Sequence, residues 1–147
     1  MIQRKQTLFL LADAIIGILM FFISFIAFNR GTEPYTMNLA EGISSAVVSS
    51  NVYYPFIINT IVVILTTVVI FLYKNRVLQY KLSNLLVLFN VFITGLFFLL
   101  SYINVPVENI SYKIGAFLPL ISAIFAFLAG HFIKKDEQLV RSADRIR

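Results

Sequence analysis

The chain has 147 residues, of which 59% are hydrophobic and only 13% are charged, and its formal net charge is +5. A soluble domain carries roughly 25% charged residues, so a soluble fold of this length could not bury so much apolar surface, and we expect a membrane protein of one domain. Cysteine is absent and histidine occurs once, which excludes disulfides, thiolate metal sites, a cysteine nucleophile and histidine-rich metal sites.

The first apolar segment covers residues 8–28. As a helix it would reach about 31 Å, enough for a hydrocarbon core about 30 Å thick. A cleaved signal peptide has similar basic residues before it, here Arg4 and Lys5, but its apolar region is shorter and ends in small residues. This segment ends in Phe28 and Asn29. We therefore predict a permanent transmembrane helix over 8–28.

Residues 29–54 form the longest connection and contain the helix breakers Gly31, Pro34 and Gly42. Apolar and polar residues alternate over 37–43, and residues 46–54 are rich in Val and Tyr. Two structures are compatible with this pattern, a short exposed β-hairpin and a helix on the membrane surface.

Three more apolar segments follow, and we predict transmembrane helices over 55–73, 84–103 and 114–133. The short basic link 74–83 makes the second and third helices antiparallel neighbours. Pro119 lies inside the last segment, where we expect it to bend the helix. The predicted fold class is an all-α membrane protein, with four transmembrane helices in an up-down-up-down bundle.

Basic residues orient this bundle, because Lys and Arg gather on the cytoplasmic side of membrane proteins. Ten of the twelve Lys and Arg residues fall before 8, in 74–83 or after 133, and the other side has only Arg30 and Lys113. Both termini are therefore predicted to be cytoplasmic. Five tyrosines fall at predicted helix ends, where amphipathic rings prefer to lie: Tyr53, Tyr54, Tyr73, Tyr102 and Tyr112.

Residues 134–147 form the one long polar run of the sequence. At helical spacing four residues share one face: Leu139, Val140, Ala143 and Ile146. Glu137 and Asp144 are spaced to pair with Arg141. We predict a short amphipathic cytoplasmic tail that docks a partner, lies on anionic lipid, or is a solvated extension; its three acidic residues argue against lipid binding alone.

Four stretches of the sequence are similar to one known family: residues 1–12, residues 71–79 (FLYKNRVLQ), residues 117–121 (FLPLI) and the tail 134–147. The chain resembles a bacterial family of small four-helix membrane proteins, domain of unknown function 4293. The resemblance spans the whole chain, and the tail is its most specific part. It implies the four-helix topology and supplies no activity, ligand or catalytic residue.

Asp13 is the most costly residue of the first segment, because a carboxylate at the centre of a membrane helix costs about 2.5–3.5 kcal/mol. It shares a small or polar stripe with Gly17, Met20 and Ser24. A functional interpretation is a proton or cation relay. The alternative is structural, an interhelical hydrogen bond or a carboxyl group that reaches the cytoplasmic interface.

Polar and small stripes also mark the other segments. Asn59 and Thr66 are seven residues apart, and Asn90, Thr94 and Ser101 share a face. The last segment has a series typical of close helix packing, which could also serve a homo-oligomer: Ser122, Ala126 and Gly130.

Three polar residues are predicted to lie in the cytoplasmic half of the membrane: Asp13, Asn90 and His131. If they converge, the carboxylate and the imidazole would form a titratable pair.

The sequence contains no phosphate-binding glycine loop, nucleophile elbow or His-Glu-x-x-His zinc motif. We therefore expect a non-enzymatic accessory or regulatory protein of the bacterial inner membrane, without cofactors, which acts through helix packing and its tail. Its expected partners are the lipid bilayer and other membrane or cytoplasmic proteins, and not nucleic acid. The alternative is a small proton- or ion-coupled transporter or channel subunit that uses Asp13, Asn90 and His131.

Overall fold

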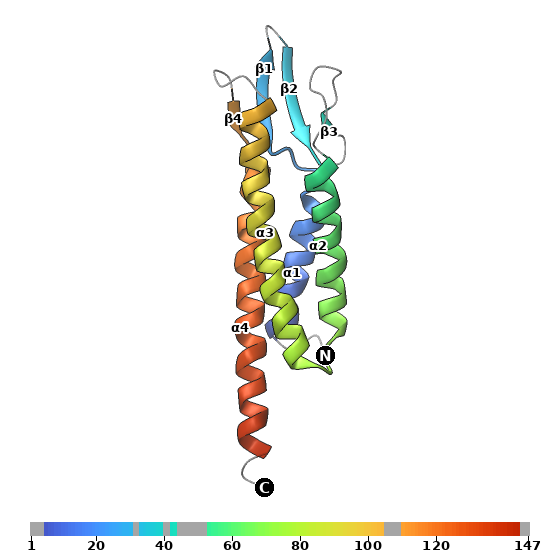
Figure 1. Ribbon diagram of the computed structural model, residues 1–147, viewed down its shortest axis with the longest axis vertical. Helices are drawn as coiled ribbons and strands as arrows, with labels where there is room; N and C mark the ends of the chain where they lie inside the picture. Colours follow the sequence, from blue (N-terminus) through green and yellow to red (C-terminus); the bar gives the residue numbers. More distant parts are fainter. Residues whose placement is uncertain (1–4, 31–32, 40–41, 44–52, 105–109, 145–147) are drawn as a thin grey trace.

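The computed structural model describes residues 5–30, 33–39, 42–43, 53–104 and 110–144. Its elements, in chain order, are α1 (Lys5–Leu19), β1 (Ile26–Arg30), β2 (Glu33–Asn38), β3 (Gly42–Ile43), α2 (Tyr53–Phe71), α3 (Arg76–Asn104), β4 (Ile110–Tyr112), the 3-10 turn η2 (Ile114–Ala116) and α4 (Leu118–Asp144). The helices run side by side in alternating directions, and a small sheet caps one end of the bundle (Figure 1). We call this end the sheet end, and the opposite end, where residues 72–75 join α2 to α3, the turn end.

The short link between α2 and α3 is made by a helix cap. The Asn75 side chain accepts a hydrogen bond from the backbone N–H of Leu78 at 3.1 Å, the usual N-cap arrangement. This cap lets α3 begin at Arg76, eight residues before the predicted start at 84. The prediction began the helix where the apolar run begins, whereas the Asn75 cap starts it earlier, and Gln79 and Ser83 are buried in the added turns. By contrast, α2 begins and ends within two residues of its predicted bounds 55–73.

The prediction of one helix over 8–28 is wrong. α1 ends at Leu19, the next residues turn through short-range backbone hydrogen bonds, and residues 26–30 form strand β1. The residues after 20 are rich in Phe and Ile, which suit a strand as well as a membrane helix. The decision lies with β2 and β4, which pair with β1 on its two sides and satisfy its backbone groups. The all-α fold class is corrected accordingly.

The sheet is antiparallel throughout, with the strand order β3-β2-β1-β4. Phe28 lies opposite Tyr35 on one side and Ile110 on the other, and Met37 lies opposite Ile43. Strands therefore form in the described part of 29–54, but they differ from the exposed hairpin expected from 37–43 and 46–54, because β2 pairs with β1 as well as β3 and Met37 and Leu39 are buried. The rest of that connection, residues 31–32, 40–41 and 44–52, lies outside the described residues.

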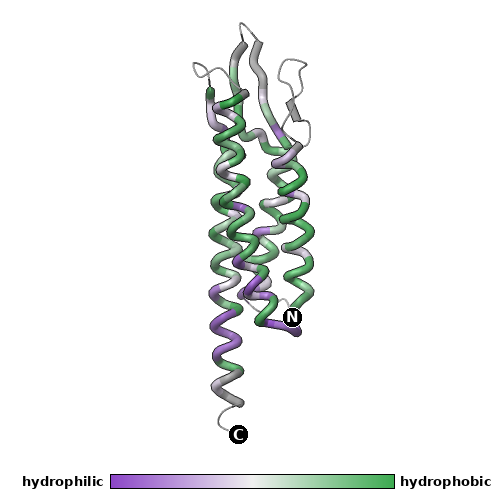
Figure 2. The backbone as a smooth tube through the Cα atoms, viewed as in Figure 1, coloured by the Kyte–Doolittle hydropathy of each residue, from purple (hydrophilic) through white to green (hydrophobic). Residues whose placement is uncertain are grey.

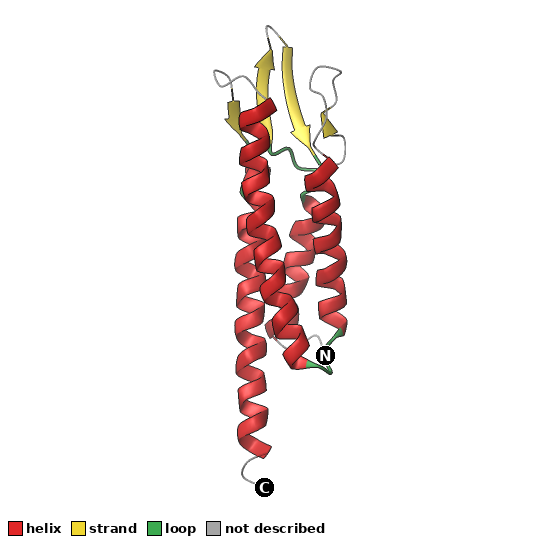
Figure 3. Cartoon of the chain, viewed as in Figure 1, coloured by secondary structure: helices red, strands yellow, loops and turns green. Residues whose placement is uncertain are grey.

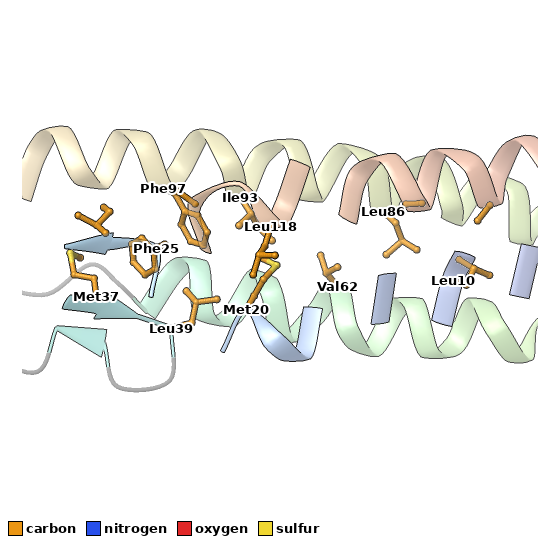
Figure 4. Close-up of a cluster of buried hydrophobic side chains, with 14 of the residues drawn as sticks. Leu10, Met20, Phe25, Met37, Leu39, Val62, Leu86, Ile93, Phe97 and Leu118 are labelled. Carbon is orange, nitrogen blue, oxygen red and sulfur yellow. The ribbon is translucent and has the colours of Figure 1, made fainter. Parts of the chain in front are cut away.

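An apolar core joins the sheet to the helices. The Phe25 ring stacks on the Phe97 ring of α3, with centroids 4.4 Å apart. Met20 and Met37 are also buried here, and Figure 4 shows these side chains pointing into the space between the sheet and the helices. The sheet is therefore a packed cap on the bundle rather than a loose loop.

The last helix is also longer than predicted. Instead of a transmembrane helix over 114–133 and a separate tail, α4 is one helix from Leu118 to Asp144, and its last turns project beyond the turn end (Figure 1). Pro119 lies in its first turn, where the missing N–H breaks no helical hydrogen bond, so the expected bend does not arise. Ile146 lies outside the described residues.

Three helical stretches are long and apolar enough to cross a membrane: Tyr54–Phe71, Arg76–Ile103 and Ile114–Val140. The fourth helix, α1, has 15 residues and reaches only about 22 Å. Hydrophobic residues predominate along the helix shafts, and hydrophilic residues gather at the turn end and in the projecting part of α4 (Figure 2). Large apolar side chains point outward from every helix, among them Leu8, Ile15, Ile64, Leu88, Phe92 and Phe127. This outward apolar surface is compatible with a membrane protein.

Gly115 sets the contact between η2 and the turn that follows α1. A Cβ at Gly115 would lie 2.5 Å from the backbone oxygen of Ser24, whereas a Cβ at Gly95, which is exposed on α3, would meet nothing within 4 Å. The two glycines thus provide a matched pair for testing this contact.

We predict that Gly115→Ala lowers the free energy of unfolding by about 1–3 kcal/mol, because the backbone at Ser24 must move. Gly95→Ala should leave it unchanged or raise it by up to about 1 kcal/mol, because alanine favours the helix. Thermal unfolding of the two purified variants in detergent checks this. Equal midpoints for both variants would contradict the contact.

Candidate functional site

The candidate site is built around the carboxyl group of Asp13, which is only 1% exposed. Its Oδ2 accepts a hydrogen bond from the Thr66 hydroxyl of α2 at 2.7 Å, and its Oδ1 accepts one from the Ser122 hydroxyl of α4. One side chain of α1 therefore bonds to two other helices. These are interhelical hydrogen bonds, as the structural alternative for Asp13 predicted.

The positions of these residues follow from helical periodicity. The buried residues of α1 are Gln6, Leu10, Asp13 and Gly17, which repeat every three or four residues and so form one face. Thr66 and Ser122 are likewise fully buried in α2 and α4. The apolar faces point outward, so the polar positions of three helices meet inside the bundle.

Asn90 brings α3 to the same depth. Gly130 of α4 lies against Ser83 and Asn84 of α3, and the two helices are antiparallel. Moving eight residues from Gly130 to Ser122 and seven from Ser83 to Asn90 covers about 12 Å and about 10 Å toward the sheet end. Asn90 and Ser122 therefore lie at nearly the same level. We call Asp13, Thr66, Asn90 and Ser122 the polar layer.

One atom of this layer has no hydrogen-bond partner. Asn90 donates from Nδ2 to the Leu86 carbonyl of its own helix at 3.1 Å, while its buried Oδ1 accepts nothing from the described part of the chain. A buried amide oxygen without a donor is costly, and such atoms are few in folded proteins. The layer thus has one acceptor more than its donors satisfy.

A second polar contact lies one helical turn closer to the sheet end. Asn59 of α2 donates from Nδ2 to the Gly17 carbonyl at 2.9 Å. A Cβ at Gly17 would lie 2.7 Å from Cγ2 of Val63, so glycine is what allows α1 and α2 to approach this closely. Gly17, singled out in the sequence as a packing residue, lies in this seam.

The electrostatic setting of Asp13 is unusual, because buried carboxylates are generally paired with a basic residue or a metal. Among the described residues, Asp13 is the only buried residue of a charged type, and the groups that contact its oxygens are hydroxyls. Nor do the described residues contain a group of three His, Cys, Asp or Glu side chains that could hold a metal ion.

His131 does not join Asp13 and Asn90. It is exposed on α4, where its ring contacts the neighbouring Phe132. It is nine residues from Ser122, about 13 Å along the helix toward the turn end. The predicted titratable pair is therefore not assembled.

The partners of Asp13 were the residues that sequence reasoning missed. It assigned Thr66 to a polar stripe and Ser122 to a packing series, and it did not link either residue to Asp13. The available signal was depth, because each of the two lies near the middle of its apolar segment. Within the packing series, Ser122 and Ala126 are buried, and Gly130 faces α3.

The start of the polar tail contacts α3. Arg76 donates to the Asp136 carbonyl at 3.0 Å, and the Lys134 ammonium lies 5.8 Å from the centre of the Tyr80 ring. Farther along, Leu139 is 60% exposed and Val140 is 45% exposed. Arg141 and Ala143 belong to the same helix, and the surroundings of their side chains lie outside the described residues.

We predict that Thr66→Val lowers the free energy of unfolding by about 1–2 kcal/mol, because it removes a buried donor to the carboxyl group while keeping the side-chain shape. Thr67→Val is the matched control. That neighbouring hydroxyl is exposed and bonds only to the Val63 carbonyl of its own helix, so its loss should cost less than about 0.5 kcal/mol. Equal losses for the two variants, measured by unfolding in mixed detergent, would refute the role of the Thr66 bond.

Comparison with known proteins adds a family but no chemistry. A search of curated proteins finds no match to this chain. The family model described as Domain of unknown function (DUF4293) matches residues 2–146, almost the whole chain, and confirms the family resemblance seen in the sequence. The chain therefore belongs to the family of the domain of unknown function DUF4293.

Proposed function

We propose that this chain is a multi-pass protein of a bacterial inner membrane that acts as a non-enzymatic accessory or regulatory protein. It recruits a partner through the last turns of α4, residues 139–144, which we call the docking arm. The observation that carries the proposal is the projection of the docking arm from the turn end as a continuation of a bundle helix, with Leu139 and Val140 exposed (Figure 3).

Two features support insertion in a membrane. The 18 residues of α2 from Tyr54 to Phe71 reach about 27 Å, close to the thickness of a hydrocarbon core. Exposed tyrosines lie near both ends of the bundle, Tyr54 and Tyr102 at the sheet end and Tyr73 at the turn end, as in an aromatic belt.

The direction of insertion follows from charge. Exposed Lys74, Lys81, Lys134 and Lys135 gather toward the turn end. By the positive-inside rule this end is cytoplasmic, and the sheet end faces outward. The docking arm then extends into the cytoplasm.

The geometry of α4 favours a protein partner over lipid. A helix that lies on the membrane surface would need a break where the chain leaves the bilayer, whereas α4 continues from its apolar part into the polar part as one helix. The docking arm therefore points along the bundle axis, away from the membrane plane.

The pattern of the docking arm indicates the kind of partner. Leu139, Val140 and Ala143 are spaced for packing against another helix, and basic residues exceed acidic ones over 134–147. We propose a partner helix with an apolar seam and acidic flanks. Two exposed aliphatic side chains bury little area, so the contact depends on a partner held at the same membrane, where the effective concentration is high.

Site-specific crosslinking tests the docking arm. The chain has no native cysteine, so a single cysteine that carries a photo-activated crosslinker can be placed at 139 or, as a control, at the exposed position 138 on a neighbouring face. In native membranes we expect a discrete adduct from 139 and little from 138, and Val140→Ser should weaken the adduct from 139. Equal labelling from both positions would argue against a docked partner.

The orientation has its own test. Single cysteines at 42, in β3, and at 142, in the docking arm, should react from opposite sides with a maleimide that cannot cross the membrane. We expect intact cells to label position 42 only, with 142 labelled after permeabilisation. Labelling of both positions in intact cells would overturn the proposed topology.

A further inference from the structure

The polar layer points to a ligand that the proposed docking function does not use. We propose that Asp13 is a proton-binding site inside the bundle, in which the neutral carboxyl group is held by Thr66 and Ser122 and its O–H faces Asn90. The ligand is a single proton. The reaction is the protonation of the carboxylate, with no other bond made or broken.

Asp13 has no counter-charge in the described part of the bundle. Thr66 of α2 and Ser122 of α4 bond to Asp13, Asn90 of α3 is buried at nearly the same level, and none of these groups carries a charge. On α1 itself the nearest described basic residue is Lys5, which is exposed and eight residues away, about 12 Å along the helix. A proton on the carboxylate removes the uncompensated charge, which no side chain of the layer can do.

The polar layer also has more hydrogen-bond acceptors than donors. The two hydroxyls donate to Oδ1 and Oδ2, and Asn90 Oδ1, at the same depth, is a buried acceptor without a donor. Protonation converts one carboxyl oxygen into a donor. The neutral acid thus supplies the donor that the polar layer lacks.

The geometry favours a proton over a sodium ion. The Thr66 hydroxyl oxygen is already in contact with the carboxyl group at 2.7 Å, and the Ser122 hydroxyl occupies the other oxygen. A sodium ion bound among these oxygens would have to break both hydroxyl hydrogen bonds to the carboxyl group and move the oxygens apart. A proton needs no such space.

Amide oxygens without a partner in the described residues lie on both sides of the polar layer. Oδ1 of Asn59 lies one turn toward the sheet end, and the Oε1 atoms of Gln6 and Gln79 lie toward the turn end. Buried acceptors of this kind are the atoms that internal water satisfies. On the sheet-end side of the layer, the stacked rings of Phe25 and Phe97 close the bundle (Figure 4). We therefore assign proton access to the turn end.

The test follows the three aspartates of the sequence, Asp13, Asp136 and Asp144. With carboxyl carbons labelled by 13C, the purified protein in lipid nanodiscs is titrated from about pH 4 to about pH 9, a range that spans ordinary carboxyl titration. We expect one signal to retain the neutral-acid position at pH values where the other two are ionised. That signal should be missing in Asp13→Asn.

Assignment does not depend on Asp13→Asn folding. In the double variant Asp136→Asn/Asp144→Asn, which changes only α4 beyond the bundle, the remaining signal belongs to Asp13. An Asp13 signal that titrates together with the other two would overturn the proposal. So would a signal that shifts with sodium concentration at constant pH, because it would identify a sodium site.

The access route is tested by hydrogen–deuterium exchange of the acid O–H, followed by the infrared carbonyl band after transfer to D2O. Gln6→Leu should slow the exchange, and Ser101→Ala, a buried polar position near the sheet end, should not. Slower exchange in Ser101→Ala alone would reverse the assigned side. A carbonyl band absent from the wild-type protein would again exclude the neutral acid.

Discussion

The hydrogen bonds of one carboxyl group connect three of the four helices. Asp13 joins α1 to Thr66 of α2 and Ser122 of α4, and the Asn59 bond to the Gly17 carbonyl adds a second link between α1 and α2. In lipid the hydrophobic effect does not drive helices together, because the tails are as apolar as the side chains. Interhelical hydrogen bonds and close backbone approach supply the association, and this seam has both.

The same constraint explains the distribution of residues over the molecule. Many leucine, isoleucine, valine and phenylalanine side chains face outward from the helix shafts, while Asn59, Thr66, Asn90 and Ser122 are fully buried together with apolar residues such as Leu86 and Ile93. A strand edge exposed to lipid would leave backbone groups without partners. The sheet accordingly lies at one end of the bundle, above the start of α2, and only helices occupy the middle (Figure 1).

α4 contributes to both the proton-binding site and the docking arm. Ser122, which bonds to Asp13, and the docking arm belong to one uninterrupted helix, and the Arg76 bond to the Asp136 carbonyl fixes this helix to α3 where it leaves the bundle. The two proposals nevertheless rest on different atoms. The proton site depends on buried groups near the middle of the helix, and the docking arm depends on exposed groups at its end.

The sequence by itself determined that helices follow residue 53. It also determined the free-energy cost of a carboxyl group at Asp13 and the small-residue series of α4. These are local properties, because each depends on the composition and spacing of neighbouring residues. It also left open the structure of residues 29–54, where β2 pairs with β3. Only the tertiary structure decided that residues 26–30 form a strand, since the strands that pair with them include residues 110–112, far along the chain. It alone chose the partners of Asp13, which lie 53 and 109 residues away, and it left His131 outside. Contacts of this kind depend on how whole helices are placed against one another, and local pattern carries no record of that placement.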